Sequence, residues 1–403
     1  MSHIVVIGAG QAGQSLVTRL RVLGFAGQVT LIGEEPVPPY QRPPLTKKYL
    51  LGETEVERLY LRPEIFYAEH DITLRLGRPV SAIDRTAKTL RIGNDQITYD
   101  QLALTTGALP RRLPAAIGGD LAGVYTVRTL ADVDAMAAEF QPGRRVLIVG
   151  GGYIGLEAAA VAALKGLHVT VVEMATRILS RVAARETADV IRAAHELHGV
   201  NISEGVGLDH LTGKGRVNGA VLGDATAMEL DFVIVGVGID PETRLAQAAG
   251  LALENGIRTD ELGQTTDASI WAAGDCTSFP YKDGSVRLEN VGNAIDQAEA
   301  VAANMLGAGQ AYVAKPWFWS DQYDLKLQIA GLNTGYDRVV TRQGSAQDHI
   351  SFWYYQGDTL LAVDAINDPR AYMVGKRLIE MGRSPKSDVI CDPATNLKSL
   401  LKL

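Results

Sequence analysis

Two glycine-rich stretches carry the residues whose types and spacing point most clearly to chemistry. Both repeat the pattern G-x-G-x-x-G, with Gly8, Gly10 and Gly13 in HIVVIGAGQAGQSL and Gly150, Gly152 and Gly155 in VLIVGGGYIGLEAAA. The pattern alone is weak evidence, because glycine turns are common. Here each turn follows an apolar strand-like run and precedes a helical stretch, where the three glycines serve a tight turn, backbone approach to a pyrophosphate and close helix packing. The helix N-terminus also offers N–H groups to phosphates, so each stretch predicts a dinucleotide site.

An acidic residue follows the second strand of each unit, where a carboxylate can accept hydrogen bonds from ribose hydroxyls. In the first unit this residue is Glu34 or Glu35, and in the second it is Glu173. A carboxylate repels the 2′-phosphate of NADP, whose sites usually offer Arg or Lys. The cation near the second turn is Arg177, and Glu173 precedes it, so the sequence favours NADH over NADPH.

Two dinucleotide sites in one polypeptide indicate that two dinucleotides meet and exchange electrons. The economical pair is a tightly held FAD and a transient NADH, because a nicotinamide delivers a hydride that a flavin can receive. One cofactor then stays while the other comes and goes.

Each turn must be held by a βαβ unit, and the sequence predicts both. In the first unit, strands 3–7 and 28–32 flank a helix at 11–23, and in the second, strands 145–149 and 168–173 flank a helix at 153–165. The segment 36–44 is expected to be a proline-rich loop that leads into a helical stretch through Tyr49 and Leu50.

The second βαβ unit interrupts the first. After a helix at 185–197, the segments VNGAVLG and MELDFVIVGVG predict a β-meander. The apolar strand in SIWAAGDC is then expected to rejoin the opening sheet, ahead of a helix at 293–306. From Tyr312 the runs LKLQIAG, HISFWYYQ and TLLAVDAI and a helix at 372–381 predict an antiparallel sheet.

The predicted fold class is therefore α/β, with two Rossmann-like dinucleotide-binding domains, one inserted in the other, and a C-terminal α+β domain with an antiparallel sheet. The predicted boundaries are 1–108 with 236–311 for an FAD-binding domain, 109–235 for an NAD-binding domain and 312–403 for a C-terminal interface domain.

Composition excludes several classes of protein. The 403 residues are 46% hydrophobic and 21% charged, as in globular proteins, and the net charge of −7 argues against nucleic-acid binding. There is no apolar run of membrane-spanning length and no secretory signal pattern, so we expect a cytoplasmic protein without a membrane partner. The two cysteines, Cys276 and Cys391, suit a reducing compartment. We assign no metal ligands.

Several motifs together resemble one family. They are VVIGAGQAG, RPPLTKKYL, LALTTGALPR, VGGGYIGLE, IWAAGDC, ENVGNAIDQAE and PWFWSDQYDLKLQIAG, which run in family order from residue 4 to about 331. The chain resembles the FAD-dependent ferredoxin reductases of bacterial oxygenase systems, the group of putidaredoxin reductase and the biphenyl dioxygenase reductase, within the glutathione-reductase-like superfamily.

The resemblance implies a set of FAD contacts beyond the first glycine turn. They are Ala12, Glu34, Lys47, Val80, Arg128, Asp275 and Val291. A cation at Lys47 would stabilise the electron-rich reduced flavin, and the alternative is a solvated surface lysine. Asp275 after an apolar strand is well placed for a sugar hydroxyl, and the alternative is an ordinary turn residue.

On the nicotinamide side, the resemblance implies that Glu157 accepts a hydrogen bond from the carboxamide and that Ile154 lies near the ring. Glu157 is expected on the first turn of its helix, where the alternative role is to complement the helix dipole. Trp319 is implied to lie against the flavin pocket, whereas Trp317 is expected in the core. Lys47, Glu157 and Trp319 are our candidate catalytic residues.

The sequence lacks the cysteines that related disulfide reductases use. Their FAD domain carries a cysteine pair, or in peroxidases and coenzyme A disulfide reductases a single cysteine, where this chain has PPYQRPPLTKKY at 38–49. We interpret Cys276 and Cys391 as ordinary thiols. Electrons are therefore expected to leave directly from the flavin.

The resemblance implies transfer of a hydride from NADH to FAD and of single electrons to a 2Fe–2S ferredoxin, which supplies a cytochrome P450 or a Rieske oxygenase. Four cations are possible docking charges or only solvated ones: Arg338, Arg342, Lys386 and Lys398. Two alternatives stay open, an NADH oxidase or small-acceptor reductase, and a redox-sensing flavoprotein like apoptosis-inducing factor.

Overall fold

The structure is a computed structural model that describes residues 2–282 and 284–402. The chain divides into two compact units. Unit 1 contains the chain up to Arg42 with Glu55–Leu109 and Ile239–Pro316, and unit 2 contains Pro43–Thr54, Pro110–Gly238 and the chain from Trp317 onward. The chain leaves unit 1 within β8 (Ala108–Pro110) and returns at β17 (Ile239–Pro241). The three domains predicted from the sequence divide the chain more finely and remain a prediction.

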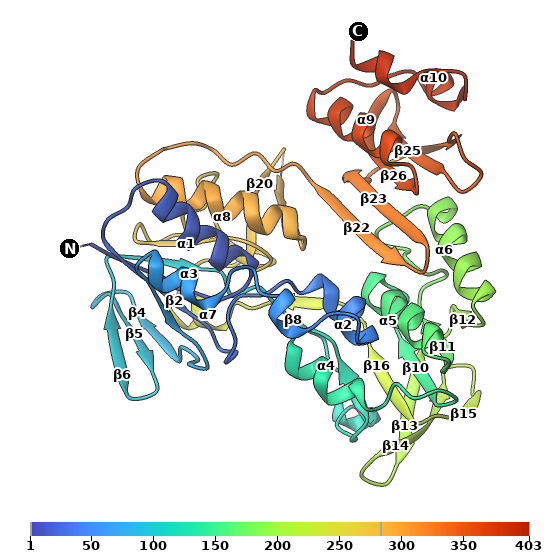
Figure 1. Cartoon of the computed structure of the whole chain (residues 1–403), viewed down its shortest axis with the longest axis horizontal. Coiled ribbons are helices and arrows are strands. Elements are labelled where there is room, and N and C mark those ends of the chain that lie inside the picture. Colours follow the sequence, from blue (N-terminus) through green and yellow to red (C-terminus); the bar gives the residue numbers. More distant parts are fainter. Residues whose placement is uncertain (1, 283, 403) are drawn as a thin grey trace. The chain divides into compact units, whose positions relative to one another are not determined.

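Unit 1 is built on a five-stranded parallel sheet in the order β19-β7-β1-β2-β3 (Figure 1). Its strands are β1 (His3–Ile7), β2 (Gln28–Ile32), β3 (Ile72–Arg75), β7 (Gln101–Leu104) and β19 (Ile270–Ala272). The strand of SIWAAGDC therefore rejoins the opening sheet, as predicted.

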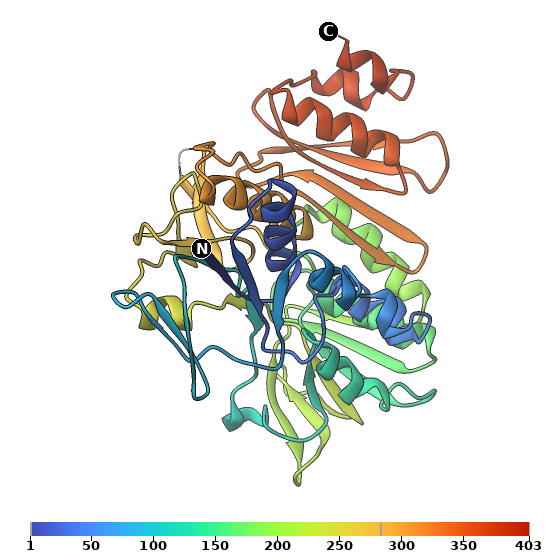
Figure 2. The ribbon, with the colours of Figure 1, turned by 60° about the vertical axis from the view of Figure 1, so that its left-hand side comes forward.

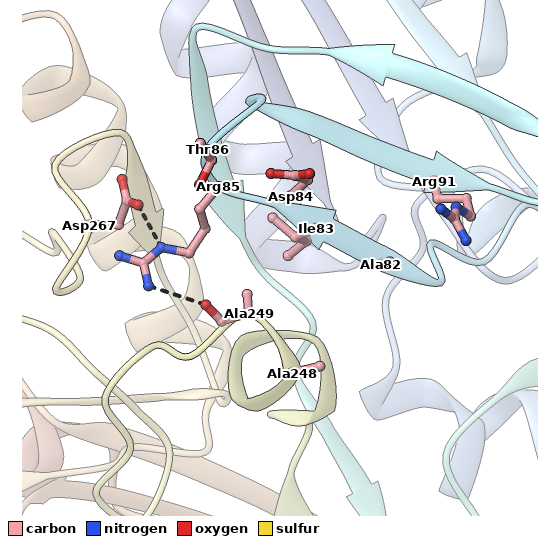
Figure 3. A pocket seen from close by; sticks show the side chains of 9 residues that line it. All are labelled: Ala82, Ile83, Asp84, Arg85, Thr86, Arg91, Ala248, Ala249 and Asp267. Atoms are coloured by element: carbon pink, nitrogen blue, oxygen red, sulfur yellow. Dashed lines mark hydrogen bonds and ion pairs between the residues drawn. The ribbon is translucent and has the colours of Figure 1, made fainter.

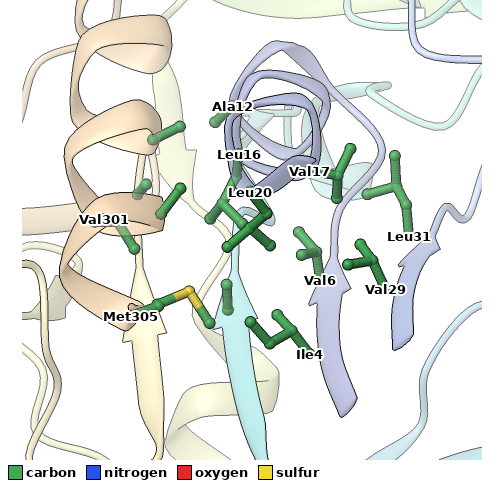
Figure 4. Close-up of a cluster of buried hydrophobic side chains, with 14 of the residues drawn as sticks. Ile4, Val6, Ala12, Leu16, Val17, Leu20, Val29, Leu31, Val301 and Met305 are labelled. Atoms are coloured by element: carbon green, nitrogen blue, oxygen red, sulfur yellow. The ribbon is translucent and has the colours of Figure 1, made fainter. Parts of the chain in front are cut away.

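The strands of unit 1 are apolar on both faces because both faces are covered. Ile4 and Val6 pack under α1 (Gln11–Val22) and α8 (Val291–Met305), and Figure 4 shows Leu16 and Leu20 of α1 directed into this cluster. Val5 and Ile7 point to the opposite face, as the two-residue period of a strand requires.

The opposite face carries smaller elements. A three-stranded antiparallel sheet and a short helix pack there, and a second small sheet and one further helix complete unit 1. They are β4 (Ala82–Asp84), β5 (Thr89–Ile92), β6 (Asp95–Thr98) and α7 (Arg244–Ala248), then β18 (Ile257–Arg258), β20 (Thr277–Tyr281), β21 (Gly284–Val286) and α3 (Glu64–Glu69).

Unit 2 contains a second five-stranded parallel sheet, in the order β12-β11-β10-β16-β9. Its strands are β9 (Val124–Thr126), β10 (Arg145–Val149), β11 (His168–Glu173), β12 (Asn201–Glu204) and β16 (Phe232–Val235), with helices α4 (Leu130–Ala137), α5 (Tyr153–Leu164) and α6 (Arg185–Leu197). This topology repeats the βαβ arrangement of unit 1.

The predicted meander is only partly correct. An antiparallel sheet forms from β13 (Leu208–Gly213), β14 (Val217–Leu222) and β15 (Ala227–Glu229). The following strand, β16, instead pairs in parallel with β10. All four of its residues are buried, which is typical of an inner parallel strand rather than of a half-exposed meander strand.

The C-terminal part of unit 2 is an antiparallel sheet in the order β22-β23-β26-β25-β24, with α9 packed along it (Figure 2). The elements are β22 (Trp317–Gln322), β23 (Leu325–Gly331), β24 (Arg338–Gln343), β25 (Ile350–Gln356), β26 (Thr359–Ile366), α9 (Pro369–Glu380) and α10 (Ser387–Cys391). The helix predicted at 372–381 begins three residues earlier, because Asp368 caps it by accepting a hydrogen bond from the Ala371 N–H at 2.9 Å.

The proline-rich segment at 43–54 belongs to unit 2. It forms a 3-10 turn, η1 (Pro43–Thr46), and then α2 (Lys48–Leu51), which confirms the expected helical stretch through Tyr49 and Leu50. Its Tyr49 hydroxyl donates a hydrogen bond to Asp134 of α4 at 2.8 Å.

Within the described residues, none of the helices combines the length and the apolar character that crossing a membrane would need. The two parallel sheets with their glycine turns and the C-terminal antiparallel sheet confirm the predicted fold class.

Candidate functional site

The first glycine turn joins β1 to α1 and has little room for side chains at two of its glycines. Gly8 has φ +114°, and a Cβ there would lie 2.2 Å from the Thr105 carbonyl oxygen. A Cβ on Gly13 would lie 2.0 Å from the carbonyl oxygen of Gly8. Both positions therefore require glycine for packing, and the turn is further held by the Thr105 hydroxyl, which donates to the Gly8 carbonyl at 2.8 Å.

The second turn, between β10 and α5, repeats this geometry in unit 2. Gly150 has φ +107°, and a Cβ there would lie 2.4 Å from the Gly236 carbonyl oxygen. A Cβ on Gly155 would lie 2.2 Å from the Gly150 carbonyl oxygen. In both turns the first glycine donates its N–H at 2.8 Å to a carbonyl near the end of the neighbouring strand, that of Ile32 in β2 or Val172 in β11.

The middle glycine of each turn faces open space. A Cβ added to Gly10 or to Gly152 would meet no atom within 4 Å among the described residues, and each glycine is the N-cap of its helix without a side-chain cap. An uncapped helix N-terminus with open space beside it fits a pyrophosphate. The residues of both turns thus fit the two dinucleotides predicted from the sequence.

In unit 1, Ala12 and Asp275 lie close to the first turn. Ala12 is buried in the first turn of α1, and its Cβ would be 3.1 Å from a Cβ on Gly274. Asp275 follows β19, a strand of the same parallel sheet as β1, and is half-buried. Since carboxyl ends of parallel strands share one sheet edge, Asp275 lies at the edge that carries the first turn.

The two acids after β2 differ in their surroundings. The Glu35 carboxylate accepts hydrogen bonds from the Tyr40 hydroxyl and the Arg42 guanidinium, both at 2.6 Å. Glu34 is exposed. Of the two carboxylates, Glu34 is therefore the more accessible to a ribose.

The two valines of the predicted FAD set occupy different positions in unit 1. Val80 is half-buried against the core on the face of β4 and β5. Val291 is the first residue of α8, whose N-cap Asn290 accepts from the Asn293 N–H at 2.7 Å.

Glu173 ends β11 and contacts the second glycine turn directly. Its carboxylate accepts hydrogen bonds from the Gly151 N–H at 2.8 Å and from the Ala175 N–H at 2.7 Å. The guanidinium of Arg177 is held by backbone carbonyls of Ile178, Ser180 and Ala183. The nearby cation is therefore directed at its own loop, which agrees with a site that does not bind a 2′-phosphate.

Glu157 and Lys47 form a buried ion pair in unit 2. The Lys47 ammonium lies 2.7 Å from Glu157 Oε2, and their side chains are 16% and 6% exposed. The same oxygen accepts from the Thr46 hydroxyl at 2.6 Å, and Oε1 accepts from the Ser320 hydroxyl at 2.7 Å. Lys47 is therefore not a solvated surface lysine.

Glu157 is not on the first turn of α5, as the sequence analysis expected. It is the fifth residue of the helix, and that first turn contains no acid. Its buried ion pair, rather than the helix dipole, accounts for the charge. Ile154 does lie in the first turn and is 42% exposed, an unusual position for an isoleucine.

The strand β22 directs alternate side chains to opposite faces. Phe318 packs against Tyr153 of α5 with ring centroids 4.8 Å apart, and Ser320 on the same face reaches Glu157. Trp319 points to the other face and stacks on Trp317, with centroids 5.4 Å apart. The expectation that Trp317 lies in the core is wrong, because both indoles are only half-buried.

Arg128 belongs to unit 2, between β9 and α4, whereas most of the predicted FAD contacts belong to unit 1. Its backbone N–H donates to Asp132 at 3.0 Å, next to the Thr129 capping box that begins α4.

Both cysteines have free thiols. Cys276 is buried and its thiol contacts the carbonyls of Leu104 and Ala273, and burial raises the pKa of this thiol. Cys391 is exposed on α10. A buried thiol with a raised pKa, as at Cys276, is the opposite of an activated thiolate.

For one of the four candidate docking cations, Arg342, the expectation of a docking or solvated charge is wrong. Arg342 is buried, and its guanidinium donates to the backbone carbonyls of Ile390, Asp392, Pro393 and Thr395. From its position in β24 it anchors the end of α10 and the residues that follow it to the C-terminal sheet. Arg338, Lys386 and Lys398 are exposed.

A pocket of about 690 Å³ opens in unit 1 between β4, β5 and α7 (Figure 3). Arg85 pairs with Asp267 at 2.7 Å and donates to the Ala249 carbonyl at 3.2 Å. None of its lining residues is a predicted site residue, and we assign no dinucleotide to it.

The sequence analysis missed Thr46, Thr105 and Ser320. Thr46 and Ser320 donate hydrogen bonds to the Glu157 carboxylate, and Thr105 donates one to the backbone of the first turn. Thr105 directly follows the apolar run of β7, and Ser320 alternates with Trp319 along β22, so strand position was the available signal.

Comparisons with known proteins agree with this geometry. The pyridine nucleotide-disulphide oxidoreductase family matches residues 2–298, and the reductase C-terminal family matches residues 317–401. Rhodocoxin reductase of Rhodococcus erythropolis is 41% identical over 389 residues, which are 95% of this chain and 91% of that protein. Putidaredoxin reductase CamA of Pseudomonas putida is 38% identical over 407 residues, 99% of this chain and 96% of its own.

A crystal structure of a covalent putidaredoxin reductase–putidaredoxin complex matches 100% of this chain and 98% of the solved chain, with a TM-score of 0.95 and 36% identity. These matches confirm the resemblance to ferredoxin reductases that the motifs carry. The chain therefore belongs to the pyridine nucleotide-disulphide oxidoreductase family.

Proposed function

We propose that this protein is an FAD-dependent NADH:ferredoxin oxidoreductase. The observation that carries the proposal is the repeated glycine turn, with Gly10 and Gly152 each open on the ligand side and Gly8, Gly13, Gly150 and Gly155 each closed by packing. Relatives that match nearly the whole chain are named as reductases of this class. Two dinucleotide sites in one chain are what transfer between nicotinamide and flavin requires.

FAD is assigned to the first turn and NADH to the second. Asp275 and Glu34 would bind sugar hydroxyls of FAD at the edge of the unit 1 sheet. The remaining proposed FAD contacts are Gly8, Gly10, Ala12, Gly13, Lys47, Val80, Arg128 and Val291. The NADH contacts are Gly150, Gly152, Ile154, Gly155, Glu157 and Glu173, and the carboxylate of Glu173 favours NADH over NADPH.

The Lys47–Glu157 pair supplies the charges of the reaction site. Bound FAD provides the redox chemistry, by accepting a hydride from NADH and passing electrons on singly. Glu157 would accept the carboxamide N–H of the nicotinamide and so orient the ring, with Ile154 near the ring. The Lys47 ammonium would stabilise negative charge on the reduced flavin, and Trp319 would lie against the flavin.

The acceptor is a 2Fe–2S ferredoxin that serves a cytochrome P450 or a Rieske oxygenase. Support comes from the relatives, one of which was solved as a complex of putidaredoxin reductase with putidaredoxin. The FAD, NAD and C-terminal interface domains at 1–108 with 236–311, 109–235 and 312–403 are part of this proposal. A cytoplasmic location is as well, and the two free thiols agree with a reducing compartment.

Anaerobic stopped-flow mixing tests the proposal. The purified protein should be yellow, NADH should bleach its flavin absorbance within a turnover, and a 2Fe–2S ferredoxin should then restore it while a cytochrome reporter is reduced. Rapid reoxidation by oxygen without ferredoxin reduction would indicate an NADH oxidase instead. A stable reduced state that no acceptor reoxidises would indicate a redox sensor.

A further inference from the structure

A set of buried polar side chains lies behind Glu157, and the reaction proposed above leaves it unexplained. Ser320 is 1% exposed, Gln322 2% and His195 0%, and they come from the adjoining elements β22 and α6 of unit 2. Together with Tyr323 we call these residues the Ser320 network. Ser320 and Gln322 share one face of β22 because side chains alternate along a strand.

The contacts form one unbranched line that ends at the carboxylate. Ser320 contacts Glu157 Oε1 at 2.7 Å, and Gln322 Nε2 contacts the Ser320 hydroxyl oxygen at 3.0 Å. His195 Nε2 lies 2.8 Å from Gln322 Oε1. The Tyr323 hydroxyl lies 3.1 Å from His195 Nδ1.

The direction of every hydrogen bond follows from Glu157. A carboxylate paired with Lys47 can only accept, so Ser320 donates its single hydrogen to it and accepts from Gln322. The Gln322 amide oxygen therefore faces His195, whose Nε2 must carry the hydrogen. In the neutral imidazole that carries its hydrogen on Nε2, Nδ1 accepts the hydrogen bond from the Tyr323 hydroxyl. Burial lowers the pKa of His195 to about 4, in agreement with a neutral ring.

The far end of the network is held rigidly. Tyr323 adopts φ +55°, an unfavourable backbone conformation for a residue with a side chain, in the turn between β22 and β23. Its ring stacks on His198 with centroids 3.7 Å apart, and its edge faces His195 at 5.1 Å. The tight turn thus fixes the tyrosine hydroxyl that orients the histidine.

Buried polar side chains are seldom needed for stability, since apolar residues of similar volume can replace a buried polar network at little cost. Here all the donors point the same way and terminate on one oxygen of Glu157, while Thr46 and Lys47 occupy the other. We propose that Ser320, Gln322 and His195 are positioning residues that fix the carboxylate of Glu157, and through it Lys47, so that the carboxylate can orient the nicotinamide. This inference rests on the roles proposed above for Glu157 and Lys47.

A paired set of substitutions tests the network. His195→Gln keeps a donor at the position of Nε2, whereas His195→Asn reaches only the position of Nδ1. Likewise Ser320→Thr keeps the hydroxyl that Ser320→Ala removes. Ser351→Ala is the matched control, because Ser351 is fully buried in the same sheet and its hydroxyl accepts a hydrogen bond at 3.0 Å from Trp353, a residue outside the Ser320 network.

Two quantities are measured on the flavin-loaded proteins: the limiting rate constant of flavin reduction by NADH, and the dissociation constant of NAD⁺ by calorimetry. Loss of one hydrogen bond to a charged group corresponds to about tenfold. We expect His195→Asn and Ser320→Ala to lower the rate constant and raise the dissociation constant by about that factor. His195→Gln, Ser320→Thr and Ser351→Ala should stay within about twofold.

A double-mutant cycle separates positioning from a general structural effect. In a Glu157→Gln background, Ser320→Ala should change the NAD⁺ dissociation constant by less than about twofold, because the oriented group is already altered. Equal behaviour of the Gln and Asn variants at 195, or an undiminished effect of Ser320→Ala in the Glu157→Gln background, would overturn the inference. If NADH does not reduce the wild-type flavin, the proposed function fails instead.

Discussion

The Glu173 carboxylate holds the backbone of the second turn in addition to its proposed role in nucleotide preference. Each oxygen of its carboxylate accepts a backbone N–H, one from Gly151 within the turn and one from Ala175 beyond β11. It therefore holds the second glycine turn in shape, and in the function proposed above it would also carry the charge that disfavours a 2′-phosphate.

We predict that Glu173→Arg lowers kcat/KM for NADH by at least about tenfold and shifts the preference toward NADPH, since charge-assisted hydrogen bonds are lost and the repulsion is removed. Steady-state kinetics with both nucleotides measure the change. Glu229→Arg is the control, because its carboxylate lies in the same unit but is 84% exposed. An unchanged ratio of NADH to NADPH activity would remove Glu173 from the site.

The sequence identified individual site residues better than it identified their partners. Glu157 and Lys47 were both candidates, yet their mutual ion pair was not predicted, because 109 intervening residues separate two side chains that only tertiary packing brings together. Arg342 shows the reverse error. Its charge indicated an exposed docking residue, but backbone carbonyls satisfy it in the interior.

At the scale of elements, the glycines of each strand–turn–helix unit differ in role: the middle one faces open space, and the first and last are required by packing. We predict that Gly10→Ala yields a folded protein with at least about tenfold weaker FAD binding, because the added methyl meets no protein atom but enters the pyrophosphate space. Gly13→Ala should instead destabilise the fold, since its methyl would lie 2.0 Å from the Gly8 carbonyl oxygen. Thermal unfolding and flavin content distinguish the two variants.

The same change in the second unit should affect the other cofactor. Gly152→Ala is expected to retain bound FAD, to unfold at the wild-type temperature and to bind NAD⁺ at least about tenfold more weakly. Calorimetry on the yellow protein measures this. Loss of flavin from Gly152→Ala together with normal NAD⁺ binding would reverse our assignment of the two turns.

His195 of helix α6 and Asp364 of strand β26 make the stability of the fold depend on pH in opposite directions. Burial lowers the pKa of His195 from 6.5 to about 4, so the unfolded chain binds the extra proton and stability is lost as pH falls through this window. Burial raises the pKa of Asp364 from 3.8 to about 6, so the folded protein binds the extra proton and gains stability as pH falls. Each effect is on the order of 3 kcal/mol, and in the wild type they largely cancel.

Substituting one of these two groups should leave the pH dependence of stability that the other group causes. We predict that His195→Gln gains in melting temperature relative to the wild type as pH falls from 6.5 to 4.5, whereas Asp364→Asn loses. Differential scanning calorimetry across this range measures the differences. Melting temperatures that run parallel for all three proteins would contradict the buried, neutral state of His195.

Elements with local signals were predicted from the sequence, and elements defined by pairing were not. The strands 3–7 and 145–149 and the helix 185–197 match the structure at both ends, because apolar periodicity and turn residues define them. The strand β16 was assigned to a meander, since a short apolar run does not reveal whether it pairs with β10 or with β15. The start of α9 was missed because the Asp368 cap and Pro369 were not considered.

On the scale of the whole molecule, the order of motifs along the chain predicted the topology. The second βαβ unit interrupts the first, and the strand at SIWAAGDC rejoins the opening sheet beside β7. The placement of residues 43–54 in unit 2 was not predicted, because the contacts of Thr46 and Lys47 with Glu157 of α5 join residues far apart in sequence. This segment brings a cation of the FAD set to the acid of the NAD set.

The central claim is that electrons pass from NADH through FAD to an external ferredoxin without a protein thiol. The most direct test is anaerobic stopped-flow reduction of a 2Fe–2S ferredoxin by NADH, comparing the wild type with the Cys276→Ala, Cys391→Ala double variant. Because Cys276 is buried beside β19 and Cys391 lies alone on α10, we predict rate constants for both half-reactions within about twofold of the wild type. A cysteine-free protein that accepts hydride normally but no longer reduces ferredoxin would contradict the account.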